Sequence, residues 1–475
     1  MRKRTAKSCF LHLLSNRFKD LESKKIIYHN AKMSRYHITT FGCQANFSDS
    51  ERIAGILESM GLKKAKNADG SDVLIFNTCS VRQTAEDRIF GLNKKLKELK
   101  TKNPELKIVL TGCITHYNKA DLKKRLPYVN FFLPIRDIAG LPNLLKTEKH
   151  SDILCRNDII KNYLSFTPKY ESKFRAYVPI SSGCNNFCSY CIVPYSRGRE
   201  KSRPAEEIIS EIKNLAENGY KEIWLLGQNV NSYNSQHLAN SNQTGKVNFS
   251  TLIKMVNNIP GDFWIRFTSP HPKDFSDDLI KTIAECEKFA HYLNLPIQSG
   301  DNEILRKMKR PYTREHYIGL MDKIRKSIPD IAVSTDIIVG FPGETKKQFQ
   351  DTAKLLKEIK FDMAYISEYS PRPGTLAAEK FKDNVPREEK IRRKKYLTEI
   401  LAKNALANNK KLINKNLDVL IDKEKGGRFF GRTKGNKIVG IFESRRSVLS
   451  KIKVGEFAKI KISTAEPWKL KGILI

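Results

Sequence analysis

The chain has 475 residues, with 86 lysine and arginine residues against 51 aspartate and glutamate residues, for a formal charge of +35. At ~150 residues per domain this length predicts about three domains, and a hydrophobic content of 40% excludes a chain that is disordered or membrane-embedded on average. No apolar run approaches the ~18–20 residues that cross a bilayer, which argues against an integral membrane protein. The basic surplus indicates a polyanionic partner such as nucleic acid or an anionic membrane surface, with a lysine-rich proteome as the alternative explanation.

The cysteine count and the N-terminal residues bear on the compartment. Nine cysteines, an odd number without a secretory signal, predict reduced thiols that serve metal binding or catalysis rather than a disulfide framework. We therefore expect a cytoplasmic protein. Residues 1–33 hold nine basic and two acidic residues and form a basic extension outside the expected fold. They are either an organellar transit peptide or residues ahead of a true start at Met33.

Residues 34–150 alternate strand and helix patterns. Strands are expected at 36–41, 73–78 and 108–112, with helical spacing at 49–61 and 81–100 between them. This rhythm predicts an open parallel α/β sheet built from βαβ units.

A cysteine follows each of these three strands at once. They are Cys43, Cys79 and Cys113, separated by 36 and 34 residues. Because the carboxyl ends of parallel strands meet at one edge of a sheet, we expect the three thiols to converge there. Three unrelated buried thiols are the alternative, which identical placement after successive strands disfavours.

A second βα series fills residues 170–400. Its expected strands are 177–181, 222–227, 264–269, 292–297, 332–340 and 364–370. Six strands alternating with helices predict a (β/α)6-type partial barrel with its site at the carboxyl-terminal edge.

The most specific local signal is the run Cys184, Cys188 and Cys191, which has the spacing C-x3-C-x2-C. It follows the expected strand 177–181, so its thiols would lie where a barrel binds its substrate. A zinc site needs a fourth ligand, and no nearby histidine or cysteine supplies one. Three cysteines suit an iron–sulfur cluster with one iron left open for a ligand; structural zinc and inert thiols are the alternatives.

From residue 386 to the C-terminus the sequence pattern differs from the preceding βα series. A lysine-rich helical stretch is expected from 386 to 415, followed by short strands with glycine turns over 407–473. Residues 408–475 carry 17 basic and six acidic side chains, which predicts a small, basic, all-β barrel.

Taken together, these motifs resemble the radical S-adenosylmethionine methylthiotransferases, in particular the tRNA-modifying MiaB branch. The resemblance covers nearly everything from Tyr36 to the C-terminus. Its motifs are TFGCQAN, NTCSVR, TGC, CNNFCSYCIVPYSRGREKSRP, LLGQNVNSY, LPIQSGD, DIIVGFPGET and YSPRPGT.

The resemblance implies two 4Fe-4S clusters and S-adenosylmethionine as cofactors. It implies that Cys184, Cys188 and Cys191 hold the cluster that binds S-adenosylmethionine, and that Cys43, Cys79 and Cys113 hold an auxiliary cluster that presents the methylthio group. By analogy with the superfamily, the residues in contact with S-adenosylmethionine are Gln228, Asn229, Ser334 and Asp336. The implied reaction is methylthiolation of carbon 2 of N6-isopentenyladenosine at position 37 of tRNA, since such a C–H bond needs a radical-generating cofactor.

The C-terminal segment resembles the TRAM domain, a small β-barrel that grips tRNA. Phosphate contacts are expected from Arg432, Lys434, Lys437, Arg445 and Arg446, and base stacking from Phe429 or Phe430. The resemblance further implies a monomer that binds the anticodon stem-loop and takes electrons from a flavodoxin or ferredoxin. The alternatives are a methylthiotransferase for threonylcarbamoyl-adenosine tRNA or a ribosomal protein, and a non-catalytic iron–sulfur RNA-binding or electron-transfer protein.

Overall fold

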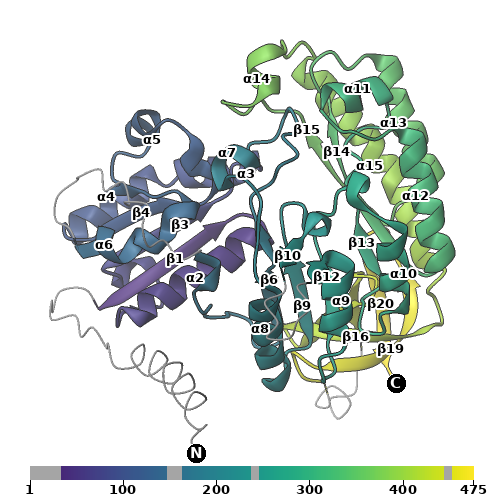
Figure 1. Ribbon diagram of the computed structural model, residues 1–475, viewed down its shortest axis with the longest axis horizontal. Coiled ribbons are helices and arrows are strands. Elements are labelled where there is room, and N and C mark those ends of the chain that lie inside the picture. The colour runs from purple at the N-terminus through teal and green to yellow at the C-terminus, as the bar shows by residue number, and fades with distance from the viewer. Residues whose placement is uncertain (1–33, 147–162, 237–244, 443–451) are drawn as a thin grey trace, which may run out of the picture.

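The computed structural model describes residues 34–146, 163–236, 245–442 and 452–475. Figure 1 shows a purple-to-blue sheet flanked by helices, a teal and green region of strands and outer helices, and a yellow β-structure that carries the C-terminus. The basic extension expected at 1–33 lies outside the described residues, as do Arg445 and Arg446.

The N-terminal part is a five-stranded sheet in the order β2-β1-β3-β4-β5, parallel throughout. Alternate residues of β3 enter separate buried clusters on the two faces, Val73 and Ile75 on one and Leu74 and Phe76 on the other. Helices therefore cover both faces, as the continuous apolar strands require. The strands are β1 (Arg35–Phe41), β2 (Lys63–Lys64), β3 (Val73–Thr78), β4 (Lys107–Thr111) and β5 (Phe131–Phe132). The helices are α2 (Gln44–Ser59), α3 (Gln83–Phe90), α4 (Asn93–Lys102), α5 (Lys119–Arg125) and α6 (Leu141–Lys146).

The central part contains two three-stranded parallel sheets, β6-β9-β12 and β13-β14-β15. A parallel bridge between Ile265 and Phe289 links them, so six strands run side by side in chain order. This is the open (β/α)6 arrangement expected from the sequence. The strands are β6 (Arg175–Pro179), β9 (Glu222–Leu226), β12 (Trp264–Phe267), β13 (Tyr292–Asn294), β14 (Ala332–Val339) and β15 (Met363–Glu368).

Helices cover the outer face of these six strands (Figure 1) and bury one large apolar core against them. They are α8 (Ala205–Glu217), α9 (Phe249–Asn257), α10 (Asp277–Glu285), α12 (Arg314–Ser327), α13 (Lys346–Ile359) and α15 (Arg387–Lys410). Three short helices lie near the carboxyl ends of the strands: α7 (Val193–Arg197), α11 (Asn302–Lys307) and α14 (Leu376–Lys380). Two small antiparallel pairs complete the part: β7 (Ser181–Ser182) with β8 (Lys201–Ser202), and β10 (Asn234–Gln236) with β11 (Lys246–Asn248).

The C-terminal strands close into a five-stranded barrel in the order β16-β17-β18-β20-β19 around its own apolar core. This confirms the small all-β barrel expected from the sequence. The strands are β16 (Asn416–Lys425), β17 (Arg428–Thr433), β18 (Ile438–Ile441), β19 (Phe457–Ala465) and β20 (Leu470–Leu474).

The C-terminal barrel docks against the amino ends of the central strands. Arg266, whose side chain is fully buried, donates from its two terminal nitrogens to the carbonyl oxygens of Thr433 and Lys434, at 2.9 and 2.7 Å. Beside it, the ring of Trp264 lies 4.6 Å from that of Phe457. The cysteine run follows β6 at the other end of these strands, so the C-terminal barrel and the thiols lie at opposite ends of the central part.

Candidate functional site

Cys43, Cys79 and Cys113 follow the carboxyl ends of three neighbouring strands. Cys43 caps the start of α2, Cys79 follows β3, and Cys113 opens a 3-10 turn after β4. The register pairs Phe41 with Thr78 and Asn77 with Thr111, so the three strands end almost level with one another. All three thiols are free, and Cys79 and Cys113 are buried. We call these residues the N-terminal trio.

The thiols of the N-terminal trio interact electrostatically. A hydrogen bond from Cys79, aided by the charge of Arg197 and the backbone amides at the start of α2, lowers the pKa of Cys43 to about 5. The same hydrogen bond and burial raise the pKa of Cys79. The Nε of Arg197 donates to the Sγ of Cys113 at 3.3 Å. Of the three, Cys43 therefore favours the thiolate, the form that binds iron.

Cys184, Cys188 and Cys191 lie on a tight loop between β7 and α7, and we call them the central trio. The loop depends on two left-handed backbone conformations, at Gly183 (φ 81°) and Phe187 (φ 45°). A Cβ at Gly183 would lie 2.2 Å from the carbonyl oxygen of Arg199, so only glycine fits there.

The central trio is also close enough for its thiols to affect one another. Burial and the neighbouring sulfurs raise the pKa of Cys191. The Nη1 of Arg310 lies 3.5 Å from the Sγ of Cys188 and supplies a buried positive charge. Each trio is therefore contacted by one arginine from another part of the chain, which offsets the negative charge that three thiolates would bring.

The donor set fits iron–sulfur clusters better than a single metal ion. Among the described residues, no three His, Cys, Asp or Glu side chains converge closely enough to hold one ion. In a cubane each thiolate binds a different iron, so the sulfurs need to surround a volume rather than one point. Buried polar atoms without a protein hydrogen bond lie beside both trios, which is consistent with space made for a further group. They are Thr78 Oγ1, Thr111 Oγ1 and His116 Nε2 near the N-terminal trio, and Ser181 Oγ, Asn229 Oδ1 and His271 Nε2 at the strand ends near the central trio.

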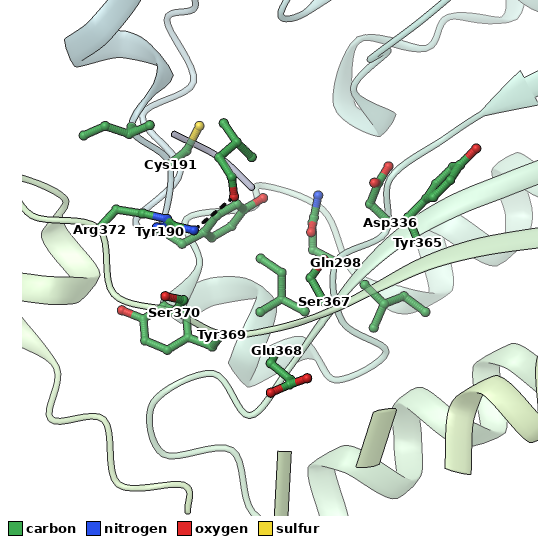
Figure 2. Close-up of a pocket in the computed structure, with 14 residues that line it drawn as sticks. Tyr190, Cys191, Gln298, Asp336, Tyr365, Ser367, Glu368, Tyr369, Ser370 and Arg372 are labelled. Atoms are coloured by element: carbon green, nitrogen blue, oxygen red, sulfur yellow. Dashed lines mark hydrogen bonds between the residues drawn. The ribbon is translucent and has the colours of Figure 1, made fainter. Parts of the chain in front are cut away.

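A cavity of about 170 Å³ opens between the two halves of the site. Val81, two residues after Cys79, forms part of its wall together with Cys191, so residues beside both trios border the same space. Figure 2 shows the side chains of Gln298, Asp336 and Tyr365 on one side and those of Tyr190, Cys191 and Arg372 on the other.

Of the four residues expected to contact S-adenosylmethionine, the structure places only Asp336 in this cavity. Its carboxylate accepts a hydrogen bond from Asn294 at 3.0 Å, and burial raises its pKa. Gln228 accepts from the amide of Gly183 at 2.5 Å and so supports the cysteine loop.

The other two expected residues make contacts with neighbouring strands and turns. The Nδ2 of Asn229 donates to Asp274 at 2.7 Å. Ser334 is hydrogen-bonded to Tyr292 and Asn294, each at 2.8 Å.

Several residues that line the cavity were not among the site residues expected from the sequence. Gln298 adopts a left-handed conformation (φ 71°) where it forms a parallel bridge with Ile337 of β14, and Arg372 reaches the cavity from the loop after β15. Both lie in motifs already quoted, LPIQSGD and YSPRPGT, which are the signals that identify this wall.

Buried ion pairs join the N-terminal sheet to the central part. Arg197 reaches Asp49 of α2 at 2.5 Å, and Arg372 reaches Glu86 of α3 at 3.2 Å. All four side chains are less than a tenth exposed. Breaking such a pair leaves an uncompensated buried charge, so the two halves of the site are held in a defined relationship.

The basic residues expected to grip RNA have different surroundings in the barrel. The Nζ of Lys437 is bound to Asp362 at 2.6 Å and to Asn409 at 2.7 Å, and its side chain is 14% exposed. Lys434 lies in the turn that Arg266 holds, and Arg432 is 3.4 Å from Asp422. The turn after β17 therefore serves the docking of the barrel.

An exposed aromatic and basic surface lies elsewhere on the barrel. The ring of Phe442 is 43% exposed, with Arg428 and Lys471 within 6 Å of its centre, at 5.8 and 5.7 Å. Lys423 lies 5.2 Å from the ring of Phe430, whereas Phe429 packs against the core of the barrel. We call Lys423, Arg428, Phe430, Phe442 and Lys471 the barrel aromatic surface.

Two family models match the chain. Residues 178–356 match the Radical SAM superfamily, and residues 35–134 match a family described as Uncharacterized protein family UPF0004. The first match contains the central trio and the second contains the N-terminal trio.

Curated relatives match almost the whole chain. A tRNA-2-methylthio-N(6)-dimethylallyladenosine synthase of Thermoanaerobacter pseudethanolicus is 44% identical over 93% of this chain and 92% of its own length. Proteins of the same name from Clostridium botulinum and Clostridium novyi are 42% and 43% identical, over 93% and 94% of this chain and 97% and 98% of their own lengths. The chain therefore belongs to the MiaB-type tRNA methylthiotransferases, a family of radical S-adenosylmethionine enzymes. Membership implies a 4Fe-4S cluster and S-adenosylmethionine.

Solved structures share the fold at low identity. The radical S-adenosylmethionine methyltransferase TsrM from Kitasatospora setae, with cobalamin and a [4Fe-4S] cluster bound, matches with a TM-score of 0.53 at 13% identity, over 73% of this chain and 74% of that chain. The cobalamin-dependent S-adenosylmethionine radical enzyme OxsB matches with a TM-score of 0.50 at 11% identity, over 78% of this chain and 56% of that chain. Within the described residues, none of the helices is long and apolar enough to cross a membrane.

Proposed function

We propose that this enzyme adds a methylthio group to carbon 2 of N6-isopentenyladenosine at position 37 of tRNA. The observation that carries the proposal is the cavity bordered by Cys191 and by Val81 beside Cys79, in a chain 44% identical to a tRNA-2-methylthio-N(6)-dimethylallyladenosine synthase. A shared cavity of this kind suits a reaction in which hydrogen removal and sulfur addition occur at one carbon.

The two trios would hold two 4Fe-4S clusters. Cys184, Cys188 and Cys191 would bind the cluster that takes S-adenosylmethionine at its open iron, and the N-terminal trio would bind the auxiliary cluster. When bound, these groups supply the radical and sulfur chemistry that an unactivated ring C–H bond requires.

The protein's own residues bind, orient and exclude water. Asp336 and Gln298 offer an acceptor and an amide to the hydroxyls and ring nitrogens of a nucleoside in the cavity. Tyr365, which is 47% exposed, provides a ring on which a base can stack at the cavity edge. Arg372 donates to the carbonyl oxygen of Val81 at 3.3 Å and so closes the wall between the two halves against water.

Three regions of the chain have separate roles in the reaction. Residues 34–150 carry the auxiliary cluster, residues 170–400 the radical chemistry, and residues 407–473 the contact with tRNA. We propose that the protein acts as a cytoplasmic monomer on the anticodon stem-loop, with a flavodoxin or ferredoxin as reductant.

Mass spectrometry of tRNA nucleosides tests the function. Cells that lack the protein should lose 2-methylthio-N6-isopentenyladenosine and accumulate its precursor without the methylthio group. Expression of the intact chain should restore the product, and the Cys188→Ala variant should not. Loss of a methylthio group from threonylcarbamoyl-adenosine or from a ribosomal protein instead would overturn the substrate assignment. A purified, reconstituted protein that releases no deoxyadenosine would overturn the enzymatic one.

A further inference from the structure

Arg197 contacts both halves of the site at once. It ends α7, six residues after Cys191, and its side chain is 3% exposed. Its Nη2 lies 2.5 Å from Asp49 Oδ2, and its Nη1 lies 3.4 Å from the Tyr163 hydroxyl. Its Nε donates to the Sγ of Cys113 at 3.3 Å. One side chain on the segment that carries the central trio therefore reaches a ligand of the N-terminal trio.

The guanidinium is suited to both contacts. Its planar fork lets the terminal nitrogens pair with a carboxylate while the Nε–H points in another direction, an arrangement that lysine cannot reproduce. Asp49 neutralises the buried charge, so the Nε–H remains available to the thiol of Cys113. Hydrogen bonds to the sulfurs of an iron–sulfur cluster stabilise its reduced, more negative form and raise its reduction potential.

We propose that Arg197 is a positioning residue that fixes Cys113 against the segment of the central trio and raises the reduction potential of the cluster bound by the N-terminal trio. The inference rests on the proposed function, because it requires that second cluster. It assigns to Arg197 an effect on one cluster and not on the other.

Arg310 provides the matched comparison. It is 7% exposed and lies 3.5 Å from the Sγ of Cys188, while its other nitrogens bind Tyr312 and the carbonyl oxygen of Pro296. It therefore makes the same kind of contact with the central trio. Arg199, two residues after Arg197, is exposed and its guanidinium lies 4.4 Å from the ring of Phe187 rather than at a thiol, so Arg199→Met controls for the loss of a nearby positive charge.

The test is a redox titration followed by electron paramagnetic resonance on the full-length, reconstituted protein. The signal that changes when S-adenosylmethionine is added identifies the cluster of the central trio, and the other signal belongs to the N-terminal trio. Arg197→Met should shift only the signal of the N-terminal trio to a more negative reduction potential. A shift of about 59 mV corresponds to a tenfold change in the ratio of oxidised to reduced cluster at a given potential. Arg310→Met should shift only the first signal, and Arg199→Met should shift neither.

A second variant covers the case in which Arg197→Met leaves Asp49 charged and the protein unfolds. Arg197→Met combined with Asp49→Asn removes both charges of the pair, so its shift reports the lost N–H···S contact alone. Unchanged potentials in this double variant, with both clusters present, would overturn the inference. A wild-type protein that holds only about four irons per chain would instead overturn the proposed auxiliary cluster, so the two failures are distinguishable.

Discussion

Arg372 donates from Nη1 to Gln83 at 2.9 Å and to Glu86 at 3.2 Å, across the boundary between the central part and the N-terminal sheet. The side chains of Arg372 and Glu86 are 8% and 4% exposed. Removal of one partner leaves the other as an uncompensated buried charge. We therefore expect Arg372→Met and Glu86→Gln each to lower the free energy of unfolding by about 3–5 kcal/mol. The double variant should recover most of this loss. Thermal denaturation of the full chain measures the effect, and equal midpoints for the single and double variants would contradict it.

The two trios should be separable by mutation. We expect Cys188→Ala to abolish cleavage of S-adenosylmethionine, because it removes a proposed ligand of the cluster that would bind S-adenosylmethionine. Cys79→Ala should spare cleavage and block sulfur insertion. Deoxyadenosine release and the methylthiolated nucleoside are measured side by side by mass spectrometry. Equal loss of deoxyadenosine release in both variants would rule out this division of labour.

The barrel aromatic surface should contribute to tRNA binding. If a base stacks on Phe442, Phe442→Ala should weaken binding by ~1–3 kcal/mol. Arg428→Ala should weaken binding and lower the slope of log affinity against log salt by ~0.7–0.9 for one lost phosphate contact. Both effects are measured by titration of tRNA at several salt concentrations.

Lys437→Met is the matched comparison for that experiment. Its ammonium is bound to Asp362 and Asn409 inside the docking interface, so we expect its loss to leave the salt slope unchanged. A slope that falls for Lys437→Met and not for Arg428→Ala would place the RNA on the turn after β17 instead.

A buried carboxyl makes stability depend on pH. Burial raises the pKa of Glu51 from 4.5 to about 7, and the charged groups that face it are Arg52, Glu171 and Glu211. Because the folded state binds this proton more tightly than the unfolded chain, its contribution is fully present below pH 4.5 and is lost as the pH rises to about 7. Glu51→Gln should therefore raise stability at pH 8 by on the order of 1–3 kcal/mol and flatten the dependence between pH 5 and 7.

Thermal midpoints across this pH range check the Glu51 prediction. Glu217→Gln is the control, since Glu217 is an exposed glutamate at the end of α8 and is not among the charged groups that face Glu51. A Glu51→Gln variant with the same pH profile as the wild type would show that Glu51 is ionised in the folded protein.

The sequence predicts strands well where buried apolar runs alternate with amphipathic helices. The expected strands 36–41, 73–78 and 108–112 correspond to β1, β3 and β4, and the six strands of the central part were expected within a few residues. The two-residue strand β2 was not, because its two lysines carry no alternating pattern and pair only with the amino end of β1. The convergence of the three cysteines that follow β1, β3 and β4 could be predicted, because the carboxyl ends of parallel strands lie at one edge of the sheet.

The contacts that complete the site could not be predicted in this way. Arg197 and Asp49 are 148 positions apart, and nothing local in either segment points to the other. From the sequence, Lys437 is expected to be a surface cation in a basic segment. In the structure it is bound to Asp362 of the central part, a contact that depends on how the barrel docks. Such pairs form between parts of the chain that are far apart in sequence. The periodicity and spacing of residues within one part do not indicate which residues of another part will contact it.

The position of the C-terminal barrel constrains the shape of the nucleic acid. It is anchored at the amino ends of the central strands, the longest of which, β14, has eight residues that span roughly 26 Å at ~3.3 Å each. If, as proposed, the barrel and the cavity both contact the tRNA, the RNA has to extend along the central part from one end of its strands to the other. On that proposal, a substrate trimmed to an isolated loop would reach the cavity without touching the barrel, so binding would depend on the length of the RNA as well as on the identity of one base.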